Sequence, residues 1–320
     1  MESSLLLPDG LRVSRLCMGA MTFGGQTEEA EAGRMVDFCF DQGITFFDTA
    51  NVYTQGRSEE ILGRCLGERR KNVILASKAR GKMPDYAGLS LPSMRRALED
   101  SLSRLGTDYL DVYYLHQPDY DVPLDESLEA LETFRQEGKI RYGAFSNYSG
   151  WQACEMQWSS EKLALQPPRI SQQMYNLLAR GLEQEYLAFA RRFGVSLVVY
   201  NPLAGGLLTG KHSSAAAPEP GGRFDANQQY QKRYWRPEAF EAVEALRGIA
   251  ERAGLSLIEL SLRWLTQQQS VGSVILGASK FEHLESNVKA AFGPSLDEAT
   301  RAACDEVWLR LRGVTPIYNR

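Results

Sequence analysis

The sequence of 320 residues is poor in histidine and cysteine, and this scarcity argues against several kinds of site. The three histidines, His116, His212 and His283, lie too far apart along the chain to predict a metal centre. The five cysteines are odd in number and widely scattered, which fits neither a disulfide framework nor a zinc-binding pattern. We therefore expect the cysteines to pack as small apolar side chains, and we expect no bound metal.

A surplus of basic charge and long apolar runs are also missing. The 36 Lys and Arg residues against 40 Asp and Glu residues leave a net charge of −4, whereas proteins that bind nucleic acid or anionic membranes usually carry a basic surplus. No apolar run approaches the roughly 18 residues of a membrane span. The first ten residues have neither the basic region nor the apolar stretch of a signal peptide. We expect a soluble, cytoplasmic protein that binds neither nucleic acid nor membranes.

Short apolar or β-branched runs alternate with amphipathic segments along most of the chain. Eight of these runs predict strands, at 16–19, 44–47, 73–76, 110–115, 140–145, 171–174, 197–200 and 274–276. Helical periodicity lies between them, most clearly at 30–41, 92–105, 124–136, 150–161 and 182–193. Such alternation predicts an α/β protein with a parallel sheet, which can be an open doubly wound sheet or a closed barrel.

The strand count of eight favours the closed (β/α)8 barrel, or TIM barrel, which takes about 250 residues as one unit. The open sheet is less favoured because Gly19-Ala-Met-Thr-Phe-Gly24-Gly25, after the first strand, lacks the G-x-G-x-x-G spacing. A Pro8-Asp9-Gly10 turn between 5–7 and 11–13 predicts an N-terminal hairpin that plugs the barrel floor. The remaining length forms a long loop at 201–236 and a C-terminal helix and tail at 294–320, so we expect residues 1–320 to be one domain.

Polar residues follow several predicted strands, and the C-terminal ends of barrel strands converge on one site. Four of them, Asp48, Tyr53, Lys78 and His116, carry a definite chemistry. A free tyrosine has a pKa of about 10, and a nearby ammonium group lowers that pKa. A carboxylate beside Lys78 keeps the amine charged and aimed, and His116 can orient a substrate oxygen. The set predicts protonation of a carbonyl oxygen while a hydride reaches its carbon.

Each of the four residues has an ordinary explanation when it is taken alone. Asp48 can cap a turn, Lys78 can be solvated, and His116 can be a buried histidine with satisfied hydrogen bonds. Their shared position at strand ends, in one order along the chain, favours a common catalytic site.

The hydride source that suits this chemistry is a nicotinamide. Ser146, Asn147 and Gln173 carry donors and acceptors suited to its carboxamide, and Tyr200 offers an aromatic face to its ring. The Gly-rich segment from Ala204 to Lys211 lets the backbone approach a pyrophosphate closely.

Several segments, in their order along the chain, resemble those of the aldo-keto reductase superfamily. They are Asp48-Thr-Ala-Asn-Val-Tyr53, Lys78, Tyr114-Leu-His116, Ser146-Asn147, and Gln173 before Tyr175-Asn176. The resemblance covers essentially the whole chain and implies a (β/α)8 barrel that binds NADP(H). It also implies that the four residues are a catalytic tetrad, with Tyr53 as the general acid and Asp48 close to the cofactor.

The segment after the seventh strand is similar to the aflatoxin-aldehyde reductase branch, which includes succinic-semialdehyde reductases. The similarity implies cofactor contacts from Arg223 and from Tyr200, Asn201, Pro202, Leu203, Gly205, Gly206, Leu207 and Lys211. It implies substrate contacts from His116, Tyr230, Arg233 and Arg320, and two arginines suit the capture of a carboxylate. The resemblance thus implies NADPH-dependent reduction of small aldehydes or ketones, and a homodimer is one expected assembly.

The last cofactor segment departs from the superfamily pattern. Many members carry a Lys where Gly277 stands, an Arg near His283 and a Glu at Ser286. Ser279, His283 and Asn287 can still serve the adenosine end, and a helix N-terminus near Ser279 can aid a 2′-phosphate. The 277–279 stretch also resembles potassium-channel β-subunits, so an NADP(H)-bound regulatory or sensor protein is the alternative function.

Overall fold

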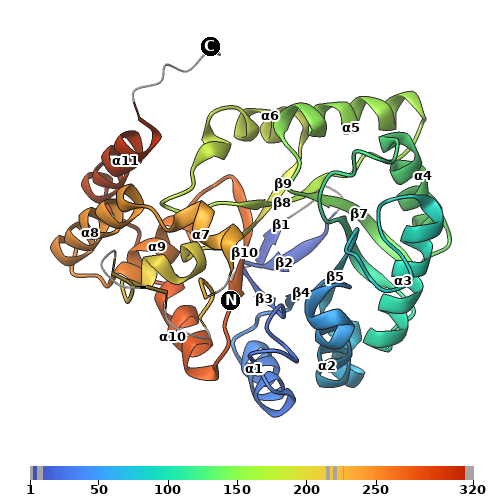
Figure 1. The fold of residues 1–320 in the computed structure, drawn as a ribbon, viewed down its shortest axis with the longest axis horizontal. Helices are drawn as coiled ribbons and strands as arrows, with labels where there is room; N and C mark the ends of the chain where they lie inside the picture. Colours follow the sequence, from blue (N-terminus) through green and yellow to red (C-terminus); the bar gives the residue numbers. More distant parts are fainter. Residues whose placement is uncertain (1–2, 6–9, 214–216, 219–221, 226, 314–320) are drawn as a thin grey trace.

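The computed structural model describes residues 3–5, 10–213, 217–218, 222–225 and 227–313. Eight parallel strands close into a barrel in the order β10-β3-β4-β5-β6-β7-β8-β9 (Figure 1). The strands are β3 (Leu16–Gly19), β4 (Phe46–Asp48), β5 (Ile74–Ala79), β6 (Leu110–Leu115), β7 (Ile140–Ser146), β8 (Ile170–Met174), β9 (Ser196–Tyr200) and β10 (Val271–Gly277). The predicted (β/α)8 barrel is confirmed, and the open sheet is excluded.

Each barrel strand is followed along the chain by a helix that packs outside the barrel (Figure 1). These helices are α1 (Glu29–Asp41), α2 (Arg57–Leu66), α3 (Leu91–Leu105), α4 (Leu124–Gln136), α5 (Gly150–Lys162), α6 (Tyr186–Phe193), α9 (Leu257–Thr266) and α10 (Phe281–Ala291). The predicted helix at 182–193 starts later than expected, because Gly181–Glu183 forms a separate 3-10 turn. Gly194 ends α6 with a φ of 65°, a left-handed conformation that glycine adopts without a steric penalty.

Three further helices lie outside the repeating pattern. The helices α7 (Gln228–Tyr234) and α8 (Pro237–Arg252) come between β9 and α9, and α11 (Glu298–Arg312) follows α10. Figure 1 shows α8 and α11 side by side at one edge of the barrel. No helix in the described part of the chain is long and apolar enough to cross a membrane.

Side chains along the strands alternate between the barrel interior and the surrounding helices, because successive strand residues point to opposite faces. In β4, Phe46 joins an interior cluster whereas Phe47 packs in the outer core. The interior cluster consists of Leu11, Val13, Cys17, Phe46, Ala76, Val112, Tyr114, Ala144, Ile170, Val198 and Ile275. Two residues beyond an interior residue, several strands carry a polar side chain at the C-terminal mouth of the barrel.

The barrel floor is covered by the N-terminal hairpin. Strands β1 (Ser3–Leu5) and β2 (Arg12–Ser14) pair antiparallel, and Leu11 and Val13 belong to the interior cluster. This confirms the predicted plug. The paired arms differ from the predicted 5–7 and 11–13, and residues 6–9 and the C-terminal 314–320 lie outside the described residues.

Candidate active site

A cleft of about 920 Å³ opens at the C-terminal mouth of the barrel. This volume lies within the range of roughly 300–1,000 Å³ that is typical of small-molecule sites. Most of the residues predicted for the site line it. They are Asp48, Tyr53, His116, Ser146, Asn147, Tyr200, Asn201, Pro202, Leu203, Gly205, Gly206, Lys211, Arg223, Tyr230, Arg233, Ser279, His283 and Asn287.

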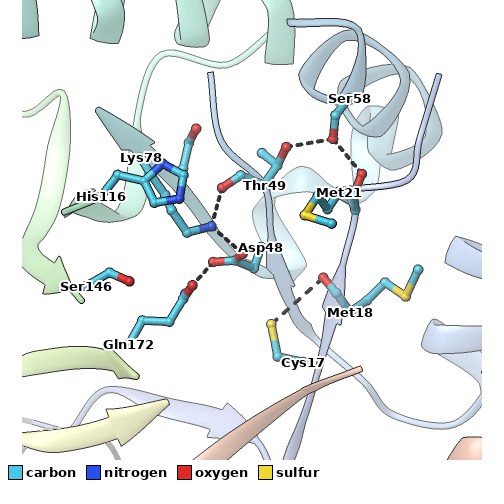
Figure 2. Close-up of polar contacts among 12 residues, drawn as sticks. Cys17, Met18, Met21, Asp48, Thr49, Ser58, Lys78, His116, Ser146 and Gln172 are labelled. Carbon is cyan, nitrogen blue, oxygen red and sulfur yellow. Dashed lines mark hydrogen bonds and ion pairs between the residues drawn. The ribbon is translucent and has the colours of Figure 1, made fainter. Parts of the chain in front are cut away.

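Asp48 and Lys78 form a buried ion pair at the base of the cleft (Figure 2). Asp48 is the last residue of β4, and Lys78 points inward from β5, fully buried. The Lys78 ammonium pairs with Asp48 Oδ1 and also donates to the backbone oxygen of Thr49 at 2.7 Å. Because a buried ammonium group is stable only when its charge is compensated, these contacts hold Lys78 charged and in one place.

Tyr53 lies beside this pair on the turn that follows β4. The Lys78 ammonium is 5.0 Å from the centre of the Tyr53 ring. Thr54 and Gln55, immediately after it, have positive φ values of 48° and 56°, and the Thr54 hydroxyl donates to the backbone oxygen of Phe23 at 2.7 Å. The left-handed conformation therefore reverses the chain just after Tyr53. The Thr54 hydrogen bond anchors this segment to the loop after β3.

The electrostatics keep Tyr53 protonated and Lys78 charged. Burial raises the pKa of Tyr53, and the attraction of Lys78 offsets this only in part, so the pKa stays above its ordinary value. The Lys78 ammonium group does lower the pKa of Tyr53, as expected, but burial raises this pKa by more. Burial alone lowers the pKa of Lys78, but Asp48 and Tyr53 outweigh it and leave that pKa raised.

His116 packs against Tyr53 in an edge-on arrangement, with ring centres 5.9 Å apart. Burial, with smaller contributions from Lys78 and Arg80, lowers the pKa of His116 to about 3. The imidazole is therefore neutral at physiological pH, where it can orient an oxygen atom but is a weaker candidate than Tyr53 for donating a proton.

Ser146, Asn147 and Tyr200 form a connected wall of the cleft. Asn147 has a φ of 64°, and its amide nitrogen donates to Ser146 Oγ at 3.0 Å and to the backbone oxygen of His116 at 2.8 Å. The Tyr200 hydroxyl donates to Asn147 Oδ1 at 2.7 Å. The amide of Asn147 thus links the ends of β6, β7 and β9.

Gln173, predicted for the same wall, points the other way. Its amide nitrogen donates to Tyr148 O, Ser171 Oγ and Tyr186 Oη, all on the outer side of β8. The neighbouring Gln172 faces the cleft and donates to Asp48 Oδ2 at 2.8 Å (Figure 2). The structure therefore corrects the prediction by one residue. The alternation of β8 is the signal that could have found it, because Ile170 is interior.

The Gly-rich loop forms a 3-10 segment, Ala204–Thr209, at the cleft edge. Gly205 and Gly206 have φ values of 71° and 107°, and a Cβ on Gly205 would lie 2.9 Å from Tyr230 Cδ1. Asn201 Oδ1 accepts from the Gly205 backbone at 2.7 Å. Leu207, predicted to contact a cofactor, buries its side chain in the outer core and is not among the residues that line the cleft.

Tyr230 is flanked by two arginines at the mouth of the cleft. The guanidinium carbons of Arg223 and Arg233 lie 5.4 and 5.8 Å from the centre of its ring. Both arginines line the cleft, so this part of the mouth carries positive charge. Arg320, predicted to join them, lies outside the described residues.

A further part of the cleft wall is built by β10 and the start of α10. Ser279, His283 and Asn287 line it as predicted, and Thr22, Gln26 and Lys280 line it without having been predicted. Within the described residues, no group of three or more His, Cys, Asp or Glu side chains is arranged to hold a metal ion.

A comparison of the sequence with models of protein families shows to which family the chain belongs. The model of the aldo/keto reductase family matches residues 15–309. The chain belongs to this family. This aldo-keto reductase is therefore an oxidoreductase, as the residues at the strand ends predicted, and its family implies a small-molecule carbonyl substrate.

Relatives of this aldo-keto reductase carry names of more than one kind. An "Uncharacterized oxidoreductase YrpG" of Bacillus subtilis is 35% identical, covering 99% of this chain and 98% of its own. A "Probable voltage-gated potassium channel subunit beta" of Oryza sativa is 38% identical over 88% of both chains. An "Aflatoxin B1 aldehyde reductase member 2" of Rattus norvegicus is 34% identical, covering 95% of this chain and 87% of its own.

Proposed function

We propose that this protein reduces aldehydes, and some ketones, to alcohols with NADPH. The observation that carries the proposal is the cluster at the base of the cleft, where Tyr53 is protonated, Lys78 is charged and His116 is neutral at physiological pH. A bound nicotinamide supplies the hydride that the carbonyl carbon receives. A carbonyl oxygen that gains negative charge then needs a proton donor within reach, and Tyr53 is that donor.

The chain's own residues divide the work at the carbonyl group. Tyr53 transfers its phenolic proton to the carbonyl oxygen, and the Lys78 ammonium stabilises the negative charge left on Tyr53. Asp48 holds Lys78 charged and in position. His116, as a neutral imidazole, orients the carbonyl oxygen toward Tyr53.

The residues of the cleft fit a nicotinamide dinucleotide. Ser146, Asn147 and Gln172 offer amide and hydroxyl groups for the carboxamide, and Tyr200 offers its ring face. Gly205 and Gly206 expose backbone in a conformation disfavoured for other residues, which suits close approach of a pyrophosphate. Lys211 and Arg223 supply positive charge for the phosphates, and Ser279, His283 and Asn287 would hold the adenosine end.

Carboxylate-bearing aldehydes are the substrate class that suits the mouth of the cleft. Arg233 and Tyr230 face it, and the similarity to the aflatoxin-aldehyde reductase branch implies Arg320 as a second arginine for this role. A guanidinium group binds a carboxylate through two parallel hydrogen bonds. The name of the rat relative, an aldehyde reductase, supports the aldehyde assignment.

The test is NADPH oxidation by the purified protein with succinic semialdehyde and with 4-nitrobenzaldehyde, measured side by side. Steady turnover of either aldehyde is the expected result. The rival function is an NADP(H)-bound regulatory protein, which the identity to potassium-channel β-subunits favours. Tight NADPH binding with negligible turnover of both aldehydes would support that rival, and absence of NADPH binding would refute both.

A further inference from the structure

A carboxylate from another helix occupies the start of α10. The backbone nitrogen of Phe281, the first residue of α10, donates to Glu31 Oε1 of α1 at 2.7 Å. The residue before it, Lys280, makes no side-chain cap, because an ammonium group has no acceptor for a backbone N–H. Glu31 therefore acts as the anion that a helix N-terminus favours.

Glu31 is held in this position by a contact between α1 and α10. Its second oxygen, Oε2, accepts from Arg34 Nη1 at 2.9 Å. The Arg34 guanidinium lies 4.5 Å from the centre of the Phe281 ring, and Phe38 packs edge-on against the same ring. The Glu31 side chain is 25% exposed, so its charge is only partly screened by solvent. Both of its oxygens are engaged, so the carboxylate is fixed at the start of α10, with the Arg34 guanidinium as its counter-ion.

Residues of the same turn line the cleft. Ser279, Lys280 and His283 all face the cleft there. A second anion bound at this turn would meet the Glu31 charge and a helix N-terminus whose partial positive charge is already compensated. Lys280, directly before α10, is the cation in this turn that can pair with such an anion. Arg34 is already paired with Glu31.

We propose that Glu31 is a specificity-determining residue that weakens binding of a 2′-phosphate, so that this protein binds NADPH only slightly more tightly than NADH. The inference rests on the proposed function, which places the adenosine end of the dinucleotide beside Ser279 and His283. NADH has a hydroxyl where NADPH has the 2′-phosphate, and therefore lacks the charge that Glu31 repels.

The test compares adenine nucleotides that differ only at this phosphate. Equilibrium titrations of the full chain measure Kd for NADPH, NADH, 2′,5′-ADP and 5′-AMP. For the wild-type protein we expect each 2′-phosphorylated compound to bind at most about tenfold tighter than its counterpart, since one lysine and a compensated helix end face the phosphate. A much larger selectivity in the wild-type protein would overturn the proposal without any variant.

The decisive variant is Glu31→Gln, which removes the charge and keeps an oxygen to accept from Phe281. We expect it to tighten NADPH and 2′,5′-ADP by about fivefold at low salt, and to leave NADH and 5′-AMP unchanged. Glu29→Gln is the matched control, because Glu29 lies in the same turn of α1 but pairs with Arg64 of α2. Glu31→Asp keeps the negative charge, so this variant should keep the wild-type ratio of the NADPH and NADH affinities.

Two other results have different meanings. An equal change in NADPH and NADH affinity, or an effect no larger than that of Glu29→Gln, would overturn the role of Glu31 while leaving the cofactor site intact. A wild-type protein that binds none of the four nucleotides would instead refute the proposed function.

Discussion

Gln172 Nε2 donates a hydrogen bond of 2.8 Å to Asp48 Oδ2 across the mouth of the barrel. The other oxygen of Asp48 pairs with Lys78, so a single carboxylate joins residues of β4, β5 and β8. Asp48 is nearly fully buried, and both of its oxygens have partners. The position of the ammonium beside Tyr53 therefore depends on a residue from the far side of the barrel.

We expect Gln172→Leu to lower kcat/KM for aldehydes by about tenfold, because a buried carboxylate oxygen loses its donor and the Lys78–Asp48 pair shifts. Gln173→Leu is the matched control on the same strand. It leaves Tyr186 Oη and Tyr148 O without this partner and should lower the free energy of unfolding by about 1–3 kcal/mol. Steady-state kinetics and urea unfolding of both variants measure the two effects. Equal kinetic losses in both would contradict the separate roles.

Tyr53→Phe should reduce aldehyde turnover by about 10²–10⁴-fold, because the carbonyl oxygen loses its proton donor. The affinity for NADPH should change little, since the aromatic ring remains in place and only the hydroxyl group is removed. Tyr230→Phe is the control, and it should keep turnover of an uncharged aldehyde near the wild-type rate. Single-turnover kinetics and NADPH titration check both statements. Wild-type turnover by Tyr53→Phe would remove Tyr53 from the proton step.

His116 makes stability depend on pH in a definite direction. Its pKa is lowered from 6.5 to about 3 by burial and by the charges of Lys78 and Arg80. Between these pH values the unfolded chain binds a proton that the folded protein does not bind, so the His116 contribution to stability is lost as the pH falls below 6.5.

The measurement is the urea midpoint of the wild-type protein and of His116→Gln at pH 7 and pH 5. The wild-type protein should lose more stability between the two pH values than the variant, which has no titrating group at this position. An identical pH dependence in the two proteins would show that His116 is accessible to protons in the folded state.

Arg233 should discriminate between charged and uncharged aldehydes. We expect Arg233→Gln to raise the KM for succinic semialdehyde by about 5–20-fold and the KM for 4-nitrobenzaldehyde by less than about twofold, because only the first carries a carboxylate. Removal of Arg320 should act in the same direction. Arg236→Gln is the control, since Arg236 donates to the backbone oxygen of Lys232 and does not line the cleft. Equal changes in both KM values would disprove the carboxylate clamp.

Much of the site could be predicted because its residues follow recognisable strands. Asp48, Lys78 and Ser146 are each two residues beyond an interior apolar residue, at the point where strand alternation brings a side chain to the barrel mouth. The prediction that Gln173 lines the cleft was wrong for the same reason, since a shift of one residue along a strand moves the side chain to the other face of the barrel wall. The side chain of Leu207, within a Gly-rich loop, packs inward against the helices, so its predicted cofactor contact can come only from its backbone.

The sequence by itself determined the alternation of strands and helices, the closed barrel and the four residues that converge on its mouth. These features follow from local periodicity and from the direction shared by parallel strands. Only the tertiary structure decided that Gln172 faces Asp48, that burial outweighs Lys78 in setting the pKa of Tyr53, and that Glu31 meets the start of α10. Each of these depends on distances between residues remote in sequence and on the exclusion of water, which no local pattern records.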